Sequence, residues 1–393
     1  MKRAMPFVVA AAIGTASVLW PQQVLSHETL TTTVLYDREI VRILDKHCVM
    51  CHVEDGPAFP LGTYEQTWLQ GRKIRADVIA RHMPPWAAVS GYGEFANDNS
   101  LTLRETQFMV GWVEGLGPRN AGTVFTNTAD TGAAHTMPMP MPGHAGHAGH
   151  WHLGEPDLTL PLSPDTIDAR RPNDIRRTVI DLGLKAEQRI RGMEYMPGDR
   201  RVVRAAFFTV QETGQWIGSW TPWYGFVELP AGSAYRLPAG SHIVAEVHYR
   251  GINSPGSSGS PGEAVVDNGM LGLFFAKVPA MGLVSDLRLE AKSAAASGRG
   301  AERLRAEMRV AADTSALALR PEIASGVKSL EVTVRRPDGG SEILLFAKDL
   351  SADWPTPYVF AKPILLRRNS VLSVTAYRDA GGAGTLRVTV SRY

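Results

Sequence analysis

The sequence predicts a multidomain protein in which a small all-α domain precedes an all-β, two-lobed region of jelly-roll or sandwich type. Three observations lead to this fold class. Apolar residues recur at helical spacing from residue 34 to about residue 118, and this periodicity is lost between residues 120 and 152. From residue 153 to residue 393, short segments alternate apolar and polar side chains and are separated by turn residues.

The predicted organisation has five parts. They are a signal peptide (1–26), the helical domain (27–119), a His/Met-rich flexible linker (120–152), and two β-sandwich lobes (153–284 and 285–393). A chain of 393 residues is longer than one typical domain, which is consistent with such a division.

The first residues have the pattern of a secretory signal. Lys2 and Arg3 precede an apolar run from residue 6 to residue 20, and Val24 and Ser26 suit the positions just before a cleavage site. The run is shorter than the roughly 20 apolar residues of a membrane span, so we expect no transmembrane anchor after signal removal. We expect a periplasmic or secreted protein.

The charge balance is nearly neutral. The chain has 41 basic and 39 acidic residues, a formal net charge of +2. This balance gives no electrostatic reason to expect nucleic acid as a partner.

Three helices are expected. The segment 34–47 is amphipathic and runs directly into Cys48, and the segment 64–82 ends before the Met-Pro-Pro sequence at 83–85. A capping box formed by Thr102 and Glu105 begins the third helix.

The β region offers several clear strand patterns. Examples are residues 176–182, 201–210 and 242–250. Two further pairs, 330–334 with 342–347 and 371–377 with 386–390, flank Gly-rich turns and are predicted to be hairpins.

The segment 47-HCVMCH-52 contains the only two cysteines of the chain, Cys48 and Cys51. With His52 they match the C-x-x-C-H pattern of covalent c-type haem attachment. Thiols at this spacing can reach the two vinyl groups on one porphyrin edge, and the following imidazole is a good axial ligand. A thioredoxin-like C-x-x-C expects a βαβ setting, and a zinc site expects further cysteines or close histidines. We therefore predict covalent haem c.

Met83 is the predicted sixth ligand of the haem iron. It ends a helix and precedes prolines, and a thioether would raise the reduction potential. His82 and His47 are the alternatives. The aromatic residues Phe59, Trp86 and Trp112 are expected to line the haem pocket.

The helical zone resembles a small bacterial cytochrome c. The stretches CHVEDGPAFPLGTYEQ, RHMPPW and GWVEGLGP are similar to the cytochrome module fused to copper type II, ascorbate-dependent monooxygenase-like proteins. Relatives of peptidylglycine α-hydroxylating monooxygenase are among these proteins. The resemblance continues through GEPDLTL (154–160) and LPAGSHIVAEVHYRG (237–251), and it implies two jelly-roll-like lobes with one copper each.

The copper ligands that the resemblance implies are largely missing. His248 matches the third histidine of the first lobe, but Arg204 and Ala205 stand where an adjacent histidine pair is expected. The His-x-His of the second lobe falls on Glu322 and Ala324. No histidine follows His248, so we expect the β region to lack its catalytic coppers.

One local metal site remains a hypothesis for strand 242–250. Glu246 and His248 lie on one face of the strand and are close enough to share a metal, whereas His242 lies too far along. The alternative is the polar face of a half-exposed strand.

The predicted linker is rich in soft metal ligands. They are His135, Met137, Met139, Met141, His144, His147, His150 and His152. Thioethers suit Cu(I) and imidazoles suit Cu(II), so copper capture and a low-complexity linker without metal both stay open. An N-terminal His27 would add a chelating amine if cleavage falls there.

These patterns favour an exported haem protein in one-electron transfer with a redox partner protein or a small-molecule reductant. The β region would then serve as a binding or docking module. Two rival hypotheses remain. One is a copper monooxygenase that hydroxylates a C–H bond with electrons from the haem, and the other is a periplasmic copper-binding protein.

Overall fold

The computed structural model of the chain is built mainly from β-sheet. It describes residues 32–54, 58–120, 150–167, 173–250, 264–293, 302–323, 325–351, 354, 356–379, 382 and 384–393. Strands make up 46% and helices 13% of this part of the chain. The predicted signal peptide and most of the predicted linker lie outside the described residues.

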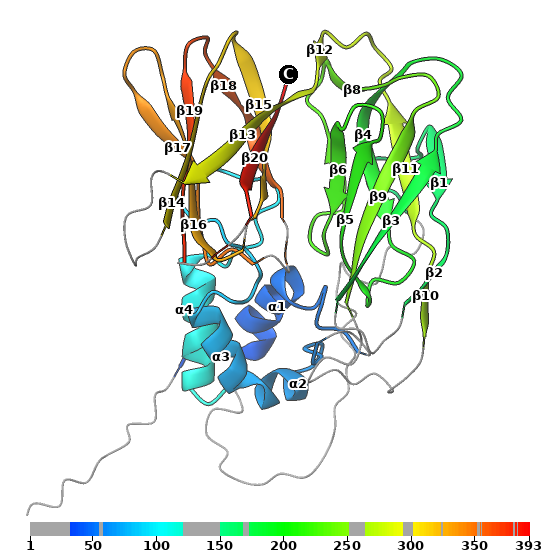
Figure 1. Ribbon diagram of the computed structural model, residues 1–393. Coiled ribbons are helices and arrows are strands. Elements are labelled where there is room, and N and C mark those ends of the chain that lie inside the picture. Colours follow the sequence, from blue (N-terminus) through cyan, green and yellow to red (C-terminus); the bar gives the residue numbers. More distant parts are fainter. Residues whose placement is uncertain are drawn as a thin grey trace, which may run out of the picture.

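The helices gather at one end of the molecule, below the sheets (Figure 1). They are a π-helical turn at Tyr36–Ile40, α1 (Val41–His47), α2 (Tyr64–Leu69), α3 (Gly71–Ile79) and α4 (Leu103–Glu114). The predicted capping box at Thr102 is confirmed. The single helix expected over 64–82 is instead divided at Gln70, where the backbone leaves helical geometry.

The expectation of a small, separate all-α domain is wrong. The helices share apolar contacts around Leu44, Met109 and Trp112. However, the chain between α3 and α4 leaves them, and Trp86, Ala88 and Phe95 join the core of the C-terminal sheet. Prolines keep this stretch from continuing as a helix, so its apolar side chains find their burial against strands.

The sequence had suggested that Trp86 lines a haem pocket. Its side chain lies instead in the core of the C-terminal sheet. Its ring lies 5.1 Å from the Tyr358 ring and 6.0 Å from the Phe95 ring, centroid to centroid. Isolated bridges pair Ala88 with Ala347 and Phe95 with Phe360, which extends the sheet with chain from the helical end.

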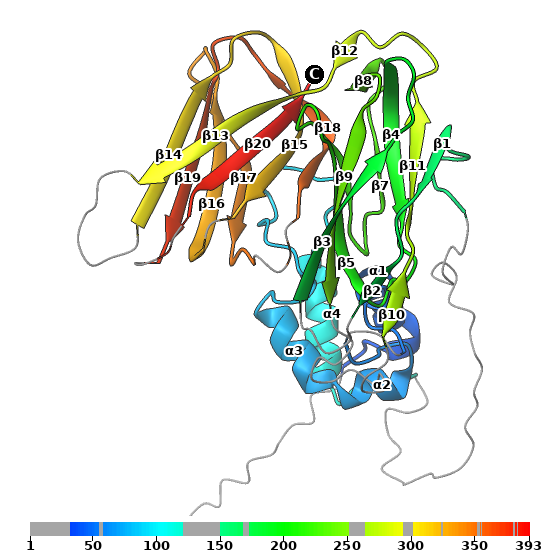
Figure 2. The ribbon, with the colours of Figure 1, turned by 45° about the vertical axis from the view of Figure 1, so that its right-hand side comes forward.

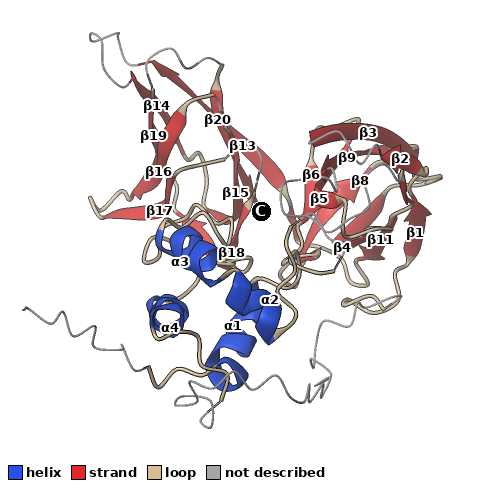
Figure 3. Cartoon of the chain, turned by 90° about the horizontal axis from the view of Figure 1, so that it is seen from below, coloured by secondary structure: helices blue, strands red, loops and turns tan. Residues whose placement is uncertain are grey.

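Among the described residues, twelve strands form the first β lobe, called lobe 1 below. They are β1 (Leu158–Pro161), β2 (Asp165–Ile167), β3 (Asn173–Asp181), β4 (Gln188–Met196), β5 (Val203–Val210), β6 (Trp216–Trp220), β7 (Phe226–Glu228), β8 (Ser233–Leu237), β9 (His242–Arg250), β10 (Val265–Asp267), β11 (Met270–Phe275) and β12 (Gly282–Leu283). One sheet has the order β1-β11-β4-β8-β12 with β7 beside β4, a second has the order β3-β9-β5-β6, and β2 pairs with β10. Seen from below, the strands curl around a common interior (Figure 3).

Lobe 2 is one eight-stranded sheet. Its strands are β13 (Ser285–Ser293), β14 (Glu302–Arg309), β15 (Thr314–Glu322), β16 (Val327–Arg335), β17 (Ser341–Lys348), β18 (Tyr358–Leu366), β19 (Val371–Arg378) and β20 (Leu386–Arg392). Their order is β17-β16-β19-β14-β13-β20-β15-β18. The all-β part of the predicted fold class is therefore confirmed.

One of the two predicted hairpins is confirmed and one is wrong. β16 and β17 pair across the turn at 336–340. β19 and β20 follow each other in the chain, but β19 pairs with β14 and β16, whereas β20 pairs with β13 and β15. Both edges of β19 are thus occupied by other strands.

The two lobes stand side by side above the helices (Figure 2). Leu317 and Ala318 of β15 belong to the hydrophobic cluster of lobe 1, so the contact between the lobes is apolar. Within the described residues, no helix combines the length and the apolar character needed to cross a membrane.

Asn97 joins the helical end to both lobes. Its side chain is buried, its Nδ2 donates to the carbonyl oxygen of Pro357 at 2.6 Å, and its Oδ1 accepts from the backbone N–H of Val359 at 3.0 Å. Its own carbonyl oxygen accepts a hydrogen bond from Trp223 Nε1 in lobe 1 at 3.2 Å.

The burial of Trp86 in lobe 2 predicts that Trp86→Ala destabilises the β-sheet. Loss of a buried indole costs about 3–5 kcal/mol of the free energy of unfolding. Urea unfolding followed by far-ultraviolet circular dichroism measures the change. The control is Trp68→Ala, whose side chain is 53% exposed and whose loss should cost far less. An unaltered sheet transition in Trp86→Ala would mean that the helical end folds by itself.

Candidate haem attachment site

The two cysteines lie in a tight turn directly after α1. Cys48 N–H donates to Leu44 O at 2.8 Å, which completes the helix, and the amides of Cys51 and His52 donate to Cys48 O at 3.1 and 3.0 Å. Both thiols are free and half-buried. The turn holds the two sulfurs and the imidazole on one short piece of chain.

The His52 ring is fixed by a backbone carbonyl. Its Nδ1 lies 2.8 Å from Phe59 O, and since a carbonyl oxygen only accepts, Nδ1 carries the proton. The Phe59 ring packs beside it, 4.8 Å away between centroids. Burial lowers the pKa of His52, so the imidazole stays neutral. Its Nε2 lone pair therefore remains available to a metal.

Burial keeps both thiols protonated. It raises the pKa of Cys48 to about 12 and the pKa of Cys51 to about 11, although Arg200 and Arg250 act in the opposite direction on Cys51. Catalytic C-x-x-C cysteines and zinc ligands are thiolates with lowered pKa values. The raised pKa values of Cys48 and Cys51 therefore differ from those of a catalytic C-x-x-C pair.

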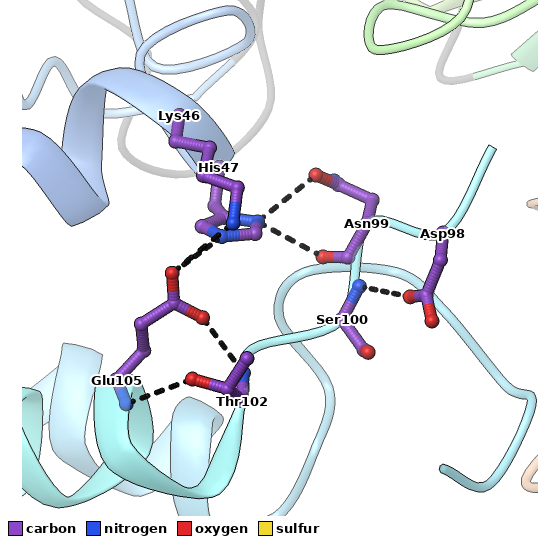
Figure 4. A network of polar contacts seen from close by, with 7 residues as sticks. All are labelled: Lys46, His47, Asp98, Asn99, Ser100, Thr102 and Glu105. Carbon is purple, nitrogen blue, oxygen red and sulfur yellow. Dashed lines mark hydrogen bonds and ion pairs between the residues drawn. The ribbon is translucent and has the colours of Figure 1, made fainter. Parts of the chain in front are cut away.

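His47, the residue before Cys48, lies between Asn99 and Glu105 and contacts both (Figure 4). It is 5% exposed, its Nδ1 lies 3.2 Å from both Asn99 O and Asn99 Oδ1, and its Nε2 lies 3.3 Å from Glu105 Oε1. Since both nitrogens are engaged, His47 is not free to act as the sixth ligand. It fixes instead the end of α1, from which the turn of residues 48–52 starts; this turn is called the attachment turn below.

Glu105 is the ionised partner in these contacts. Burial alone would raise its pKa, but hydrogen bonds from the backbone and side chain of Thr102 and from Lys46 lower the pKa to about 2. Lys46 Nζ lies 3.2 Å from Glu105 Oε1. One carboxylate thus caps α4 and holds the end of α1.

The donor set fits a covalently attached haem. Cys48 and Cys51 offer neutral thiols at the required spacing, and His52 offers one oriented, unprotonated nitrogen. Phe59 supplies the carbonyl that sets the orientation of this ring, a role that metal-binding histidines regularly require.

Met83 remains the candidate for the sixth ligand. It is half-buried and follows α3, and its backbone N–H donates to Asp77 O at 3.4 Å. α3 passes close to the His52 side, because Lys73 Nζ lies 6.0 Å from the centroid of the Phe59 ring. The alternative His82 is 70% exposed at its side chain and faces Asp77, with Nδ1 3.7 Å from Oδ1.

The structure brings Glu246 and His248 together, as the local metal hypothesis expects, but within the described residues it does not bring His248 together with His150 and His152. His248 lies on β9, 6% exposed, and its Nε2 donates to Glu246 Oε1 at 2.7 Å. Ala205 of β5 lies directly opposite His248 in the sheet. The position at which the resemblance expects a histidine thus carries only a methyl group, and no group of three or more His, Cys, Asp or Glu side chains here could hold a metal.

His150 and His152 lie in a different place, at a cleft of about 390 Å³ that Met50 also lines. His152 Nδ1 lies 2.7 Å from Glu194 Oε1, and Glu194, 2% exposed, also accepts the backbone N–H groups of His152 and Leu153. His144 and His147, with the methionines of the predicted linker, lie outside the described residues.

Comparisons with known proteins identify no family. No family model matches the chain, and no curated protein matches it. The chain is similar to the solved structure of the major capsid protein P2 from bacteriophage PM2, with 8% identity and a TM-score of 0.27, over 58% of this chain and 97% of that chain. An allantoicase structure matches with 14% identity and a TM-score of 0.19, over 58% of this chain and 83% of that chain.

Two contributors to the site were missed from the sequence. Phe59 was expected as a pocket wall, whereas its carbonyl oxygen holds the His52 ring. The following Pro60 was an available signal, since the residue before a proline is held extended. Glu105 was recognised as a cap, but its contact with His47 joins residues 58 positions apart and has no local signature.

The low pKa of Glu105 predicts that the stabilisation from its contacts with His47 and Lys46 is lost in acid. Because the folded-state pKa of about 2 lies below the ordinary value of 4.5, Glu105 stabilises the fold above about pH 4.5, and this contribution is lost as the pH falls toward 2. Glu105→Gln should lower the free energy of unfolding by about 1–3 kcal/mol at pH 7, with a smaller difference at pH 3.

Urea unfolding at several pH values measures this difference. The exposed Glu94 gives the matched control variant Glu94→Gln, which should leave the stability nearly unchanged. A constant gap between Glu105→Gln and the unmodified protein from pH 7 to pH 3 would contradict the assignment.

Proposed function

We propose that the chain is an exported c-type haem protein that transfers single electrons. The observation that carries this proposal is the state of His52. Its Nδ1 is bound to Phe59 O, its Nε2 is left for a metal, and it directly follows a turn that holds two free, half-buried cysteines. This combination supports haem attachment more strongly than the C-x-x-C-H pattern does by itself.

Each residue of the site has a defined task in this proposal. Cys48 and Cys51 would hold the haem through thioethers, and His52 would bind the iron through Nε2. Phe59 keeps the His52 ring in one orientation and one tautomer, and Met83 would supply a second ligand to the iron. When bound, the haem supplies a one-electron couple whose potential depends on its axial ligands and on the polarity around it.

The β lobes serve as a binding or docking module in this proposal. Their role as a copper monooxygenase loses support, because Ala205 lies opposite His248 and no histidine follows His248 in the sequence. The reductant or electron acceptor is a redox protein or a small molecule that meets the chain near the attachment turn.

Export is part of the same proposal. The first 26 residues have the pattern of a signal peptide, and attachment of c-type haem takes place outside the bacterial cytoplasm. These two arguments support the proposal of a periplasmic or secreted protein.

Replacement of the sixth ligand tests the proposal. Met83→Ala should abolish the absorption signature of thioether ligation and lower the reduction potential, on the order of 100 mV, because a thioether stabilises ferrous iron. The measurements are the visible spectrum and a redox titration of the exported protein.

His82→Ala is the control for the neighbouring position, because its side chain is 70% exposed. It should leave the spectrum and the potential unchanged. If Met83→Ala retains both while His82→Ala alters them, the sixth ligand is His82. If neither purified variant nor the unmodified protein has a c-type spectrum, the proposed function is wrong.

A further inference from the structure

A cavity of about 600 Å³ lies between the two β lobes. Lobe 1 contributes Trp216 of β6, Val227 of β7 and Tyr235 of β8, and lobe 2 contributes Leu317 of β15 and Phe360 of β18. Its volume falls within the usual range for small-molecule sites, roughly 300–1,000 Å³. No site discussed above uses it.

The walls of this cavity suit a flat apolar molecule. Trp216 and Tyr235 are 2% and 1% exposed, and Val227, Leu317 and Phe360 are also buried. Buried aromatic rings stack well on planar ligands and are held rigidly by the surrounding core.

Three uncharged hydrogen-bond donors in the cavity lining have no partner among the described residues. Neither the hydroxyl of Tyr235 nor that of Tyr224, which also lines the cavity, makes a hydrogen bond within the described residues. Trp216 Nε1 is buried and unpartnered in the same wall. Burial raises the pKa of Tyr224 to about 12 and also raises that of Tyr235, so both hydroxyls keep their protons.

The charged side chains at the cavity are already paired. Arg191 forms an ion pair with Glu228, and both residues line the cavity. Lys277 Nζ lies 3.6 Å from Asp157 Oδ1. A ligand that carries a formal charge would therefore find no unpaired counter-ion among these groups, whereas an uncharged oxygen acceptor would satisfy the free donors.

We infer that the cavity between the lobes binds a small, uncharged, planar cyclic dione of the quinone class. A quinone is planar and apolar over its ring, and its carbonyl oxygens accept hydrogen bonds but carry no charge. The hydroxyls of Tyr224 and Tyr235 donate to these oxygens, while Trp216, Leu317 and Phe360 cover the ring.

The cavity adjoins the cleft near the attachment turn. Tyr224 and Ala96 line both the cavity and the cleft that contains Met50, one of the two residues between the cysteines. The cavity and the cleft therefore share part of one wall. The binding itself requires no haem.

Titration calorimetry with duroquinone tests this inference. Its ring is fully substituted, so Cys48 and Cys51 do not readily add to it. We expect saturable binding to the full-length exported protein. Tyr235→Phe and Tyr224→Phe should each weaken the affinity about 3- to 10-fold, because each removes one hydrogen bond and keeps the ring. Removal of an unpaired buried hydroxyl does not impair folding.

Tyr377→Phe is the matched control, since Tyr377 is 45% exposed on β19 and does not line the cavity. It should bind duroquinone with unchanged affinity, whereas Ala361→Trp, which places an indole in the cavity lining, should abolish binding. Absence of saturable binding to the unmodified protein would overturn the inference. Equal affinity in the unmodified protein, Tyr235→Phe and Tyr224→Phe would overturn it as well.

Discussion

The three hydrogen bonds of Asn97 are the constraint on which the arrangement of this molecule depends. Its amide binds the backbone of Pro357 and Val359 in lobe 2, and its carbonyl accepts the indole N–H of Trp223 in lobe 1. The residue is 3% exposed, so a broken bond would leave a buried polar group without a partner, at a cost of about 1–3 kcal/mol. Since Asn97 also follows the stretch that enters the lobe 2 core, the helical end cannot move independently of the sheets.

The contacts of Asn97 also help to fix the position of the attachment turn. Asn99, two residues after Asn97, holds His47 from one side, and Glu105 holds it from the other. His47 ends α1, and the turn with Cys48 begins there. Phe59 then orients the ring of His52. All residues of this site come from the helical end, but its position depends on the contacts of Asn97 with both lobes. The cavity between the lobes shares Tyr224 and Ala96 with the cleft near this site.

Local sequence patterns could predict much of this structure, but contacts between distant residues could not be predicted from them. The alternation of residues 242–250 predicted β9 at its observed bounds, and the capping box at Thr102 predicted the start of α4. In contrast, the pairing of β19 with β14 and β16, and the entry of Trp86 into lobe 2, depend on residues far apart in the chain. Burial in the tertiary structure determines both features, and a single sequence does not show which distant residues are buried together. The same limit applies to the site, where C-x-x-C-H identified the cysteines but not the carbonyl of Phe59.

The most direct measurement of the central claim is the mass of one tryptic peptide. Cleavage after Lys46 and Arg72 releases residues 47–72, which contain both cysteines and His52. From protein exported by a host competent in c-type haem maturation, the account predicts this peptide with the added mass of haem and no thiol that reacts with an alkylating reagent. Recovery of the unmodified peptide with two alkylated cysteines would contradict it.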